Sequence, residues 1–297
     1  MKYEIPRGYL SASSLGTFIT CPKQYEFRYV KNLIIPPNAA LVTGSVIHKV
    51  FETYYKDAMS SSQRLTAEQS AELASDIASD YLKENDIGTT SQEEVSDIQK
   101  LAPVITKTYV DKVARHISPI ATEEELRVTM ACGVDILGYL DLRHKLEHSE
   151  DDVKVAEENG IELAVEGIAD YKITKKKWTI DRLKNSLQFN LYTTLTGIGD
   201  VQIHNMTKDI PKPMARKPRA SSSDDEGVTD LAGNLRVLHH RFTGDDADHL
   251  ETMVETAARI ITSGTFMPCA LDAWNCNPEW CGYWNLCRGH SRTLYSM

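Results

Sequence analysis

Two side chains near the middle of the chain have types and spacing suited to metal-dependent hydrolysis. Asp170 and Lys172 are two positions apart in the segment IADYKIT, and in an extended strand such positions lie on the same face. The carboxylate can bind a divalent cation, while the ammonium can orient or deprotonate water and stabilise charge on phosphorus. The pair alone is a weak indication, because an ion pair on an edge strand has the same pattern.

Other polar side chains could join this pair. Asp141 lies in a second predicted strand and would supply another carboxylate. His48 and Glu52 are four positions apart in a predicted helix, so they share a face, and a neutral imidazole is a good ligand for manganese. Gln188 and Tyr192 have the same spacing in a later predicted helix, where an amide and a phenol could contact phosphate or position a ligand.

Four of the six cysteines lie in the last thirty residues. In a chain without an export signal, clustered cysteines indicate a metal or cluster rather than disulfides. Cys276, Cys281 and Cys287 are separated by four and five residues, and a closed site needs a fourth ligand. The nearby Cys269 would complete a zinc knuckle, and Cys21 is the other candidate.

Basic side chains follow the Asp170 and Lys172 pair. Lys175, Lys176 and Lys177 could neutralise phosphates while Trp178 stacks on an unpaired base, although a solvated strand end explains the same residues equally well. A second basic cluster lies in the segment 210–234, whose Pro, Ser and mixed charge predict a mobile surface loop. Its members are Lys212, Arg216, Lys217 and Arg219.

The remaining pattern predicts an α/β protein with about five strands. A short helix should begin near Ser11 and lead past Cys21, and Cys132 should be a buried strand residue. Helices are predicted from Thr43 and at 66–84, 92–116, 180–197 and 245–263; strands are predicted within 126–147, 162–174, 199–208 and 235–243. The acidic segment 147–160 is predicted to be a solvated loop.

Net charge excludes some functions. A net charge of -9 argues against coating nucleic acid with bulk positive charge, but it allows a nuclease whose cation supplies charge locally. The sequence has no apolar run long enough to span a membrane, and its amino terminus does not resemble a signal peptide, so we expect a cytoplasmic protein. It also lacks a phosphate-binding loop for an ATP-driven motor and a helix-turn-helix.

The order of these motifs resembles the RecB-like branch of the PD-(D/E)XK nuclease superfamily. The motifs are Gly44-x-x-x-His48-x-x-x-Glu52, Gly138-Tyr139-Leu140-Asp141, Asp170-Tyr171-Lys172 and Gln188-x-x-x-Tyr192. The resemblance extends from about Ser11 to Cys287. The sequence differs from the motif in the superfamily's name at Leu140, where that motif has proline. It has Asp170 at a position where glutamate is also common. Neither difference removes a functional group that the chemistry needs.

The resemblance implies roles for these residues. His48, Asp141, Asp170 and the backbone carbonyl of Tyr171 would bind the metal, and Lys172 would be the catalytic lysine. Gln188 and Tyr192 would support the site. Members with an iron-sulfur cluster, including AddB-type and CRISPR-adaptation nucleases, place one cysteine before the nuclease core and three after it. This likeness favours a [4Fe-4S] cluster on Cys21, Cys276, Cys281 and Cys287, with zinc as the alternative.

We therefore predict a restriction-endonuclease-like α/β core, with a mixed central sheet flanked by helices. One nuclease domain would span residues 1–297, with a helical insertion at 58–120 and a cluster-binding tail at 265–297 joined to Cys21. It would use Mg²⁺ or Mn²⁺ to cleave single-stranded DNA or DNA ends, as an exonuclease by family analogy, in phage or cellular recombination or repair. A helicase or recombinase could be its partner. The alternatives are a non-catalytic nucleic-acid-binding scaffold and a zinc-knuckle adaptor.

Overall fold

The computed structural model of the chain describes residues 3–61, 63–85, 92–160, 162–208 and 227–288. The predictions for Lys212, Arg216, Lys217 and Arg219 lie outside these residues. The chain divides into two compact units. Unit 1 comprises residues 1–35, 126–138 and 246–297, and unit 2 comprises residues 36–125 and 139–245. Among the described helices, none has the length and apolar character needed to cross a membrane.

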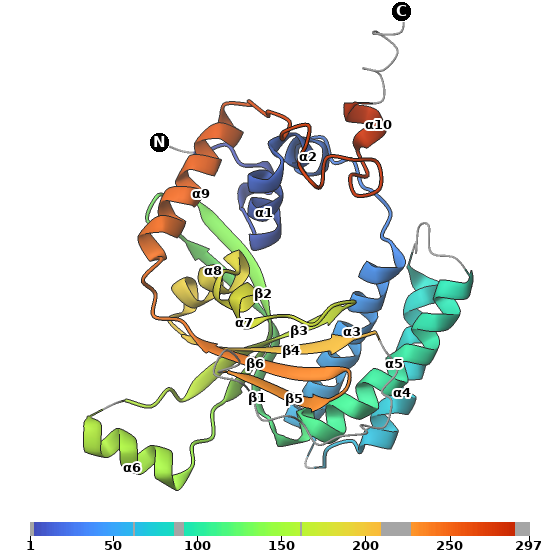
Figure 1. Ribbon diagram of the computed structural model, residues 1–297, viewed down its shortest axis with the longest axis vertical. Coiled ribbons are helices and arrows are strands. Elements are labelled where there is room, and N and C mark those ends of the chain that lie inside the picture. The colour runs from blue at the N-terminus through green and yellow to red at the C-terminus, as the bar shows by residue number, and fades with distance from the viewer. Residues whose placement is uncertain (1–2, 62, 86–91, 161, 209–226, 289–297) are drawn as a thin grey trace, which may run out of the picture. The chain divides into compact units, whose positions relative to one another are not determined.

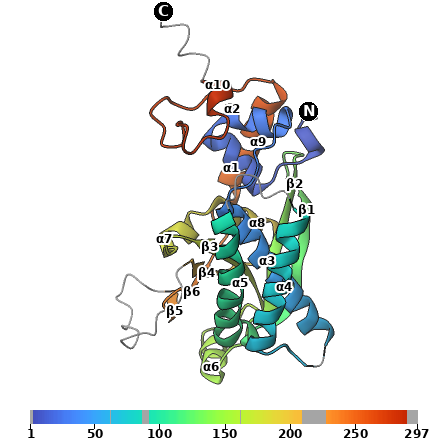
Figure 2. The ribbon, with the colours of Figure 1, turned by 90° about the vertical axis from the view of Figure 1, so that its right-hand side faces the viewer.

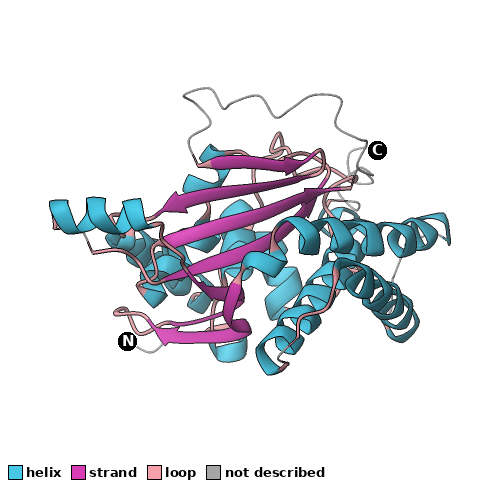
Figure 3. Ribbon diagram, turned by 90° about the horizontal axis from the view of Figure 1, so that it is seen from below, coloured by secondary structure: helices cyan, strands magenta, loops and turns pink. Residues whose placement is uncertain are grey.

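The structure is mixed α/β, with a six-stranded, mostly antiparallel sheet in the order β1-β2-β3-β4-β6-β5 (Figure 3). The strands are β1 Ser118–Thr129, β2 Asp135–Lys145, β3 Glu166–Thr174, β4 Asp200–Thr207, β5 Val228–Ala232 and β6 Leu235–Arg241. The parallel pair is β3 and β4, while β3 pairs antiparallel with β2. Residues of both units contribute to β1 and β2.

Helices flank this sheet (Figure 1). The α-helices are α1 Ala12–Thr20, α2 Pro22–Tyr25, α3 Ala39–Ser60, α4 Ala67–Glu84, α5 Gln92–Lys112, α6 Glu150–Asn159, α7 Ile180–Lys184, α8 Leu187–Thr196, α9 Ala247–Thr262 and α10 Trp284–Cys287. Short 3₁₀ turns occupy Pro6–Gly8 and Ala114–His116, and a π-helical turn, η2, occupies Glu26–Val30.

The core of unit 2 lies between the sheet and helix α3. Asn38 caps α3 by accepting a hydrogen bond from the Leu41 N–H, as N-cap residues do. The apolar side chains of α3 recur at helical spacing, and Val46, Val50 and Phe51 are fully buried. Helix α3 packs against β3, α4 and α5, and α4 lies beside α5 (Figure 2).

Several predicted elements of unit 2 need correction. The segment predicted as an acidic loop contains α6, which projects from the sheet between β2 and β3 (Figure 1). Its Glu, Ala and Lys residues are good helix formers, and its first turn carries the acidic residues that helix N-termini favour. The helix predicted at 180–197 is divided into α7 and α8 at Asn185 and Ser186. Strand β5 lies within the predicted mobile loop and forms by pairing with β6.

Unit 1 contains α1, α2, η2 and α9. Ser11 caps α1 reciprocally with Ser14, and the extended backbone of Cys21 separates α1 from α2. The predicted short helix is therefore interrupted at the cysteine. Cys132 does not lie in a strand: it occupies the turn between β1 and β2, is half-buried, and donates its N–H to Glu251 of α9.

Candidate functional site

Two buried carboxylates lie on adjacent strands of unit 2. The antiparallel register of β2 and β3 places Leu142 opposite Ala169. Asp141 precedes Leu142 on β2 and Asp170 follows Ala169 on β3, so the two aspartates are neighbours across the strand pair. Asp141 is 9% exposed and Asp170 is 3% exposed. The Tyr171 N–H donates to Asp141 Oδ2 at 2.9 Å. The Asp141 backbone carbonyl accepts a hydrogen bond from the Thr122 hydroxyl at 2.9 Å, which fixes this strand position to β1.

Lys172 forms a closed set of contacts with Asp170 and Gln188. Lys172 Nζ lies 2.6 Å from Asp170 Oδ2 and donates to Gln188 Oε1 at 3.2 Å. Gln188 Nε2 donates to Asp170 Oδ1 at 2.8 Å. Burial and the neighbouring Asp141 raise the pKa of Asp170 to about 6. The amide on α8 therefore holds both members of the predicted Asp and Lys pair in place.

His48 reaches the same site from α3. Its Nδ1 lies 3.4 Å from Asp141 Oδ2, and its Nε2 lies 3.1 Å from the Tyr171 carbonyl oxygen. Burial opposes charge on the imidazole, but Asp141 and Asp170 outweigh it and raise the pKa of His48 to about 9. In turn, burial works against the charged form of Asp141, but His48 and Lys172 keep its pKa below the usual value. The imidazole thus lies between two oxygen-bearing groups that the superfamily resemblance implies as metal ligands.

Packing of the Tyr171 side chain holds the backbone carbonyl of the same residue in position. The ring is 1% exposed and packs against Phe51 of α3 and Tyr109 of α5, with ring centroids 4.9 and 5.8 Å away. Tyr109 also donates to His204 Nδ1 at 2.8 Å. Since the ring is held in the core, the backbone carbonyl beside it is held near His48.

Glu123 of β1 joins this site, and the sequence reasoning did not identify it. Ligand atoms of His48, Glu123 and Asp141 all lie within 4.8 Å of one another. Glu123 has a left-handed backbone with φ 49°, which costs about 1–2 kcal/mol for a residue other than glycine. Burial and nearby Asp141 raise its pKa. Its only sequence signal was a run of three glutamates just before the first predicted strand, and such a run usually marks a solvated face.

Tyr192 and Glu52, the two residues predicted to support the site, lie in different surroundings. Tyr192 is buried on α8, where burial and Asp170 raise its pKa to about 12, so its phenol remains protonated. Glu52 lies one turn after His48 on α3, but its carboxylate pairs with Lys49 at 3.0 Å and Lys56 at 2.5 Å. Glu52 therefore lies outside the group of His48, Glu123 and Asp141.

The basic segment after β3 is only partly available to nucleic acid. Lys175 and Lys176 are exposed, while Lys177 pairs with Asp230 at 3.0 Å. Trp178 is 6% exposed, and the Arg182 guanidinium lies 4.1 Å from its ring centroid. The ring of Trp178 is therefore part of the protein interior, and its stacking on an unpaired base stays a prediction that requires the ring to become exposed.

The residues present fit a hard divalent cation. Their donors are carboxylate oxygens, a backbone carbonyl and one imidazole, which suit Mg²⁺ or Mn²⁺ better than a soft metal. Asp170 Oδ2 is buried, and it pairs with the Lys172 ammonium at 2.6 Å. An additional cation would give this oxygen a second ligand contact.

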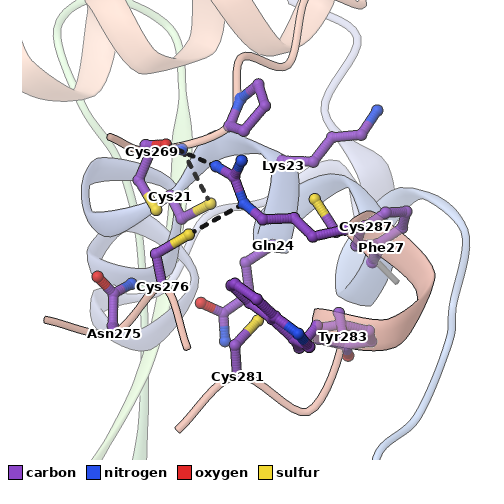
Figure 4. A pocket seen from close by; sticks show the side chains of 13 residues that line it. Cys21, Lys23, Gln24, Phe27, Cys269, Asn275, Cys276, Cys281, Tyr283 and Cys287 are labelled. Carbon is purple, nitrogen blue, oxygen red and sulfur yellow. Dashed lines mark hydrogen bonds between the residues drawn. The ribbon is translucent and has the colours of Figure 1, made fainter. Parts of the chain in front are cut away.

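A separate set of five cysteines lines one pocket of unit 1 (Figure 4). They are Cys21, Cys269, Cys276, Cys281 and Cys287. The segment after Cys21 is anchored to the tail: Phe27 and Tyr283 have ring centroids 5.4 Å apart, and Tyr283 donates to the Leu33 carbonyl at 2.6 Å. Folding therefore places Cys21 beside cysteines that are more than two hundred positions away in the sequence.

Cys269 lies close to Cys21 and Cys276 in this pocket. Its backbone N–H donates to Cys21 Sγ at 3.4 Å, and burial together with Cys21 raises the pKa of the Cys269 thiol to about 12. Arg288 donates through Nε to Cys276 Sγ at 3.2 Å. Thiolates are the usual protein ligands of zinc and iron-sulfur clusters, so the pocket has enough sulfur for either.

Carboxylates, an imidazole and a lysine that converge on adjacent strands of a mixed sheet define a metal-dependent hydrolase class. A family model described as the PD-(D/E)XK nuclease superfamily matches residues 9–288, and the chain belongs to that superfamily. This membership implies nuclease activity by hydrolysis of phosphodiester bonds. A search of curated proteins found no match.

Proposed function

We propose that the protein is a Mg²⁺- or Mn²⁺-dependent deoxyribonuclease of the RecB-like branch. The observation that supports this proposal is that His48 contacts both the Asp141 carboxylate and the Tyr171 carbonyl, while Asp170 and Lys172 form an ion pair on either side of Tyr171 in β3. These groups would hold the cation. When bound, the cation would polarise the phosphodiester and activate water.

The protein's own side chains would orient the reaction. Lys172, held by Asp170 and Gln188, would orient the attacking water, accept its proton when neutral, or stabilise charge on phosphorus. Gln188 would keep the ammonium aligned because its amide contacts both partners. Tyr192 would supply a protonated phenol near Asp170. Exposed Lys175 and Lys176 would contact the DNA backbone, independently of base sequence.

The proposed substrate is single-stranded DNA or a DNA end, and the proposed mode is exonucleolytic. Both are carried by the likeness to the RecB-like branch, since fold alone does not fix substrate. A helicase or recombinase that generates such ends would be a natural partner in phage or cellular recombination and repair.

We further propose that the cysteine pocket binds a [4Fe-4S] cluster through Cys21, Cys276, Cys281 and Cys287. Their thiols line one pocket, and two N–H groups already donate to sulfur there, from Cys269 and Arg288. Such donors stabilise the negative charge of ligated sulfur. The likeness to iron-sulfur members of the RecB-like branch favours Cys21 over Cys269 as the fourth ligand.

The nuclease proposal predicts that Lys172→Ala abolishes metal-dependent DNA cleavage. Loss of a general acid-base and electrostatic group lowers rates by about 10²–10⁴-fold. End-labelled linear single-stranded and duplex DNA, and closed circular DNA, should be incubated with wild-type protein in Mg²⁺ or Mn²⁺. We expect linear DNA to be degraded and circles to be spared.

Lys172→Gln serves as a second variant, because an amide can still donate to Asp170 and the buried carboxylate keeps a partner. Lys83→Ala on α4, whose amine pairs with Asp80 at the surface, is the matched control and should cleave normally. Circular dichroism and DNA binding should be unchanged in all variants. Cleavage by Lys172→Ala at the wild-type rate would rule out this mechanism, and cleavage of circles would rule out the exonucleolytic mode.

A further inference from the structure

Arg182 of α7 lies over the ring of Trp178, close to the proposed catalytic lysine. The guanidinium carbon of Arg182 is 4.1 Å from the Trp178 ring centroid, and the Lys172 ammonium is 5.9 Å from the same centroid. The two cations are therefore separated by no more than the sum of these distances. Lys172 is paired with the Asp170 carboxylate at 2.6 Å, so the charge of Arg182 is the one that needs an explanation.

The Arg182 guanidinium is exposed, and among the described residues no carboxylate forms an ion pair with it. The nearby acid is already occupied, because Asp230 pairs with Lys177 at 3.0 Å and with Arg236 at 2.9 Å. Stacking on an indole ring orients a planar guanidinium but leaves its positive charge in place. Arg182 is thus an oriented cation that can still bind an anion.

Buried contacts hold this cation at a set place relative to Lys172. The Trp178 ring is 6% exposed, and the Trp178 N–H donates to Asn205 Oδ1 at 2.8 Å. Asn205, which is fully buried, also donates through Nδ2 to the Lys172 carbonyl at 2.8 Å. The Arg182 N–H donates to the Thr179 hydroxyl at 3.3 Å. One buried amide therefore connects Lys172 to the ring that supports Arg182.

We propose that Arg182 binds a backbone phosphate of the DNA strand that neighbours the scissile phosphate, with the Trp178 ring as its support. This inference rests on the proposed nuclease function and deepens it. Phosphates of one strand recur about every 3.4 Å of helix rise, so the separation of Arg182 from Lys172 fits a phosphate about one or two nucleotides from the cut. A guanidinium can bind phosphate oxygens through two parallel hydrogen bonds, and such a contact is independent of base sequence.

Binding of a fluorescein-labelled single strand to the full-length protein, followed by anisotropy, tests this proposal. Ca²⁺ would replace Mg²⁺ to slow cleavage, and the titration would be repeated at several salt concentrations. We expect Arg182→Gln to weaken binding by about tenfold, as loss of a charge-assisted contact does. The slope of log affinity against log salt should become shallower by about 0.7, the value for one phosphate contact on a single strand. Arg182→Lys keeps the charge and should keep the slope.

Arg115→Gln is the matched control, because it removes the same charge from an exposed arginine that pairs with Asp111 at 3.3 Å. It should bind DNA with the wild-type affinity and slope, and circular dichroism should be the same for all the proteins. Equal weakening by Arg182→Gln and Arg115→Gln would show an effect of net charge alone and would overturn the proposal. A wild-type slope in Arg182→Gln would overturn it as well.

Cleavage of a strand with one cleavable linkage tests where the phosphate lies. Phosphorothioates would protect the other linkages, and an uncharged methylphosphonate would replace one flanking linkage at a time. Near the scissile phosphate, this replacement should raise the KM of the wild-type protein but not that of Arg182→Gln, with little change in kcat. The same rise in KM for both proteins at every linkage would refute the proposal. Failure of the wild-type protein to cleave DNA would refute the nuclease function instead, while the salt slope would still report the phosphate contact.

Discussion

His48 lies between two oxygen atoms of the site. Its two ring nitrogen atoms face Asp141 Oδ2 and the Tyr171 carbonyl. Although burial disfavours the charge, the two aspartates raise the pKa of His48 to about 9. A protonated His48 would compensate the carboxylates, and a cation bound through the proposed imidazole ligand would replace its proton.

This arrangement predicts that metal binding releases a proton. His48 is protonated below its pKa of about 9, and a ligating imidazole must be neutral. Mn²⁺ affinity should therefore rise with pH from about 7 to about 9. Isothermal titration calorimetry in two buffers of different ionisation enthalpy should detect about one proton released per chain at about pH 7.

His48→Gln is the informative variant, because it keeps a polar side chain but has no titrating proton. It should bind Mn²⁺ more weakly and with little proton release. Lys49→Gln, one residue along α3 and paired with Glu52 at the surface, should retain the wild-type proton release. The absence of proton release from the wild-type protein would show that His48 is already neutral or is not a ligand.

At the scale of elements, strand pairing decides where the site's residues lie. Asp170 and Lys172 share one face of β3, as their spacing indicates, because alternation along a strand is local. Their partners arrive through tertiary contacts: Asp141 through the β2 register, His48 from α3 and Gln188 from α8. Glu123 escaped notice because the first strand was predicted only from residue 126, whereas β1 begins at Ser118, so no strand periodicity placed its carboxylate on a face.

Helices were predicted more completely than the edge of the sheet. The long helices α3, α4, α5 and α9 have regular apolar spacing or capping residues that can be read locally. Strand β5 has only five residues, and it is stabilised by hydrogen bonds to β6 rather than by its own composition. The acidic α6 was missed because charge was read as a loop signal despite its good helix formers.

Gly227, directly before β5, is a position where a side chain should lower the stability of the fold. Gly227 has φ 83°, and a Cβ there would clash with the His239 carbonyl oxygen. Its own carbonyl accepts the His239 N–H at 2.6 Å. Gly227→Ala should lower the free energy of unfolding by about 1–3 kcal/mol, since both backbone strain and this contact are affected.

Gly233 in the same hairpin is the control for this effect. A Cβ at Gly233 would meet nothing within 4 Å, so Gly233→Ala should change stability by no more than about 0.5 kcal/mol. Thermal and urea unfolding followed by circular dichroism would measure both variants. Equal stability of the two alanine variants would contradict the role given to Gly227.

At the scale of the whole molecule, the chain forms two compact units, each with one candidate centre. The acidic centre lies in unit 2, and the cysteine pocket lies in unit 1. A cluster in that pocket would join Cys21 to the tail across a very long loop. Closing a loop stabilises a fold by reducing the entropy of the unfolded chain, and the effect grows slowly with loop length.

Loss of one cluster ligand should therefore abolish the visible absorbance of the cluster and lower the thermal stability of the protein. Cys287→Ser, purified without oxygen, should lose iron and the brown thiolate-to-iron absorbance, and it should unfold at a lower temperature than wild type. Cys269→Ser is the matched control from the same pocket and should keep its iron. Iron and zinc analysis completes the measurement.

The outcomes separate the alternatives for the pocket. Loss of iron from Cys269→Ser and its retention in Cys21→Ser would transfer the fourth ligand position to Cys269. Colourless wild-type protein with one zinc would favour a zinc knuckle. Because Lys172 lies in the other unit, Lys172→Ala should retain its iron even though cleavage is lost.

The sequence by itself determined the superfamily and the groups that could perform its chemistry. Spacing along a helix or strand is a local property, so the Asp170 and Lys172 pair, the His48 helix and the clustered cysteines could be read directly. Only the tertiary structure decided that Glu123 joins His48 and Asp141, that Trp178 is buried, and that Cys269 lies beside Cys21. Those relations depend on backbone conformation and on packing between segments distant in sequence, which local spacing does not encode.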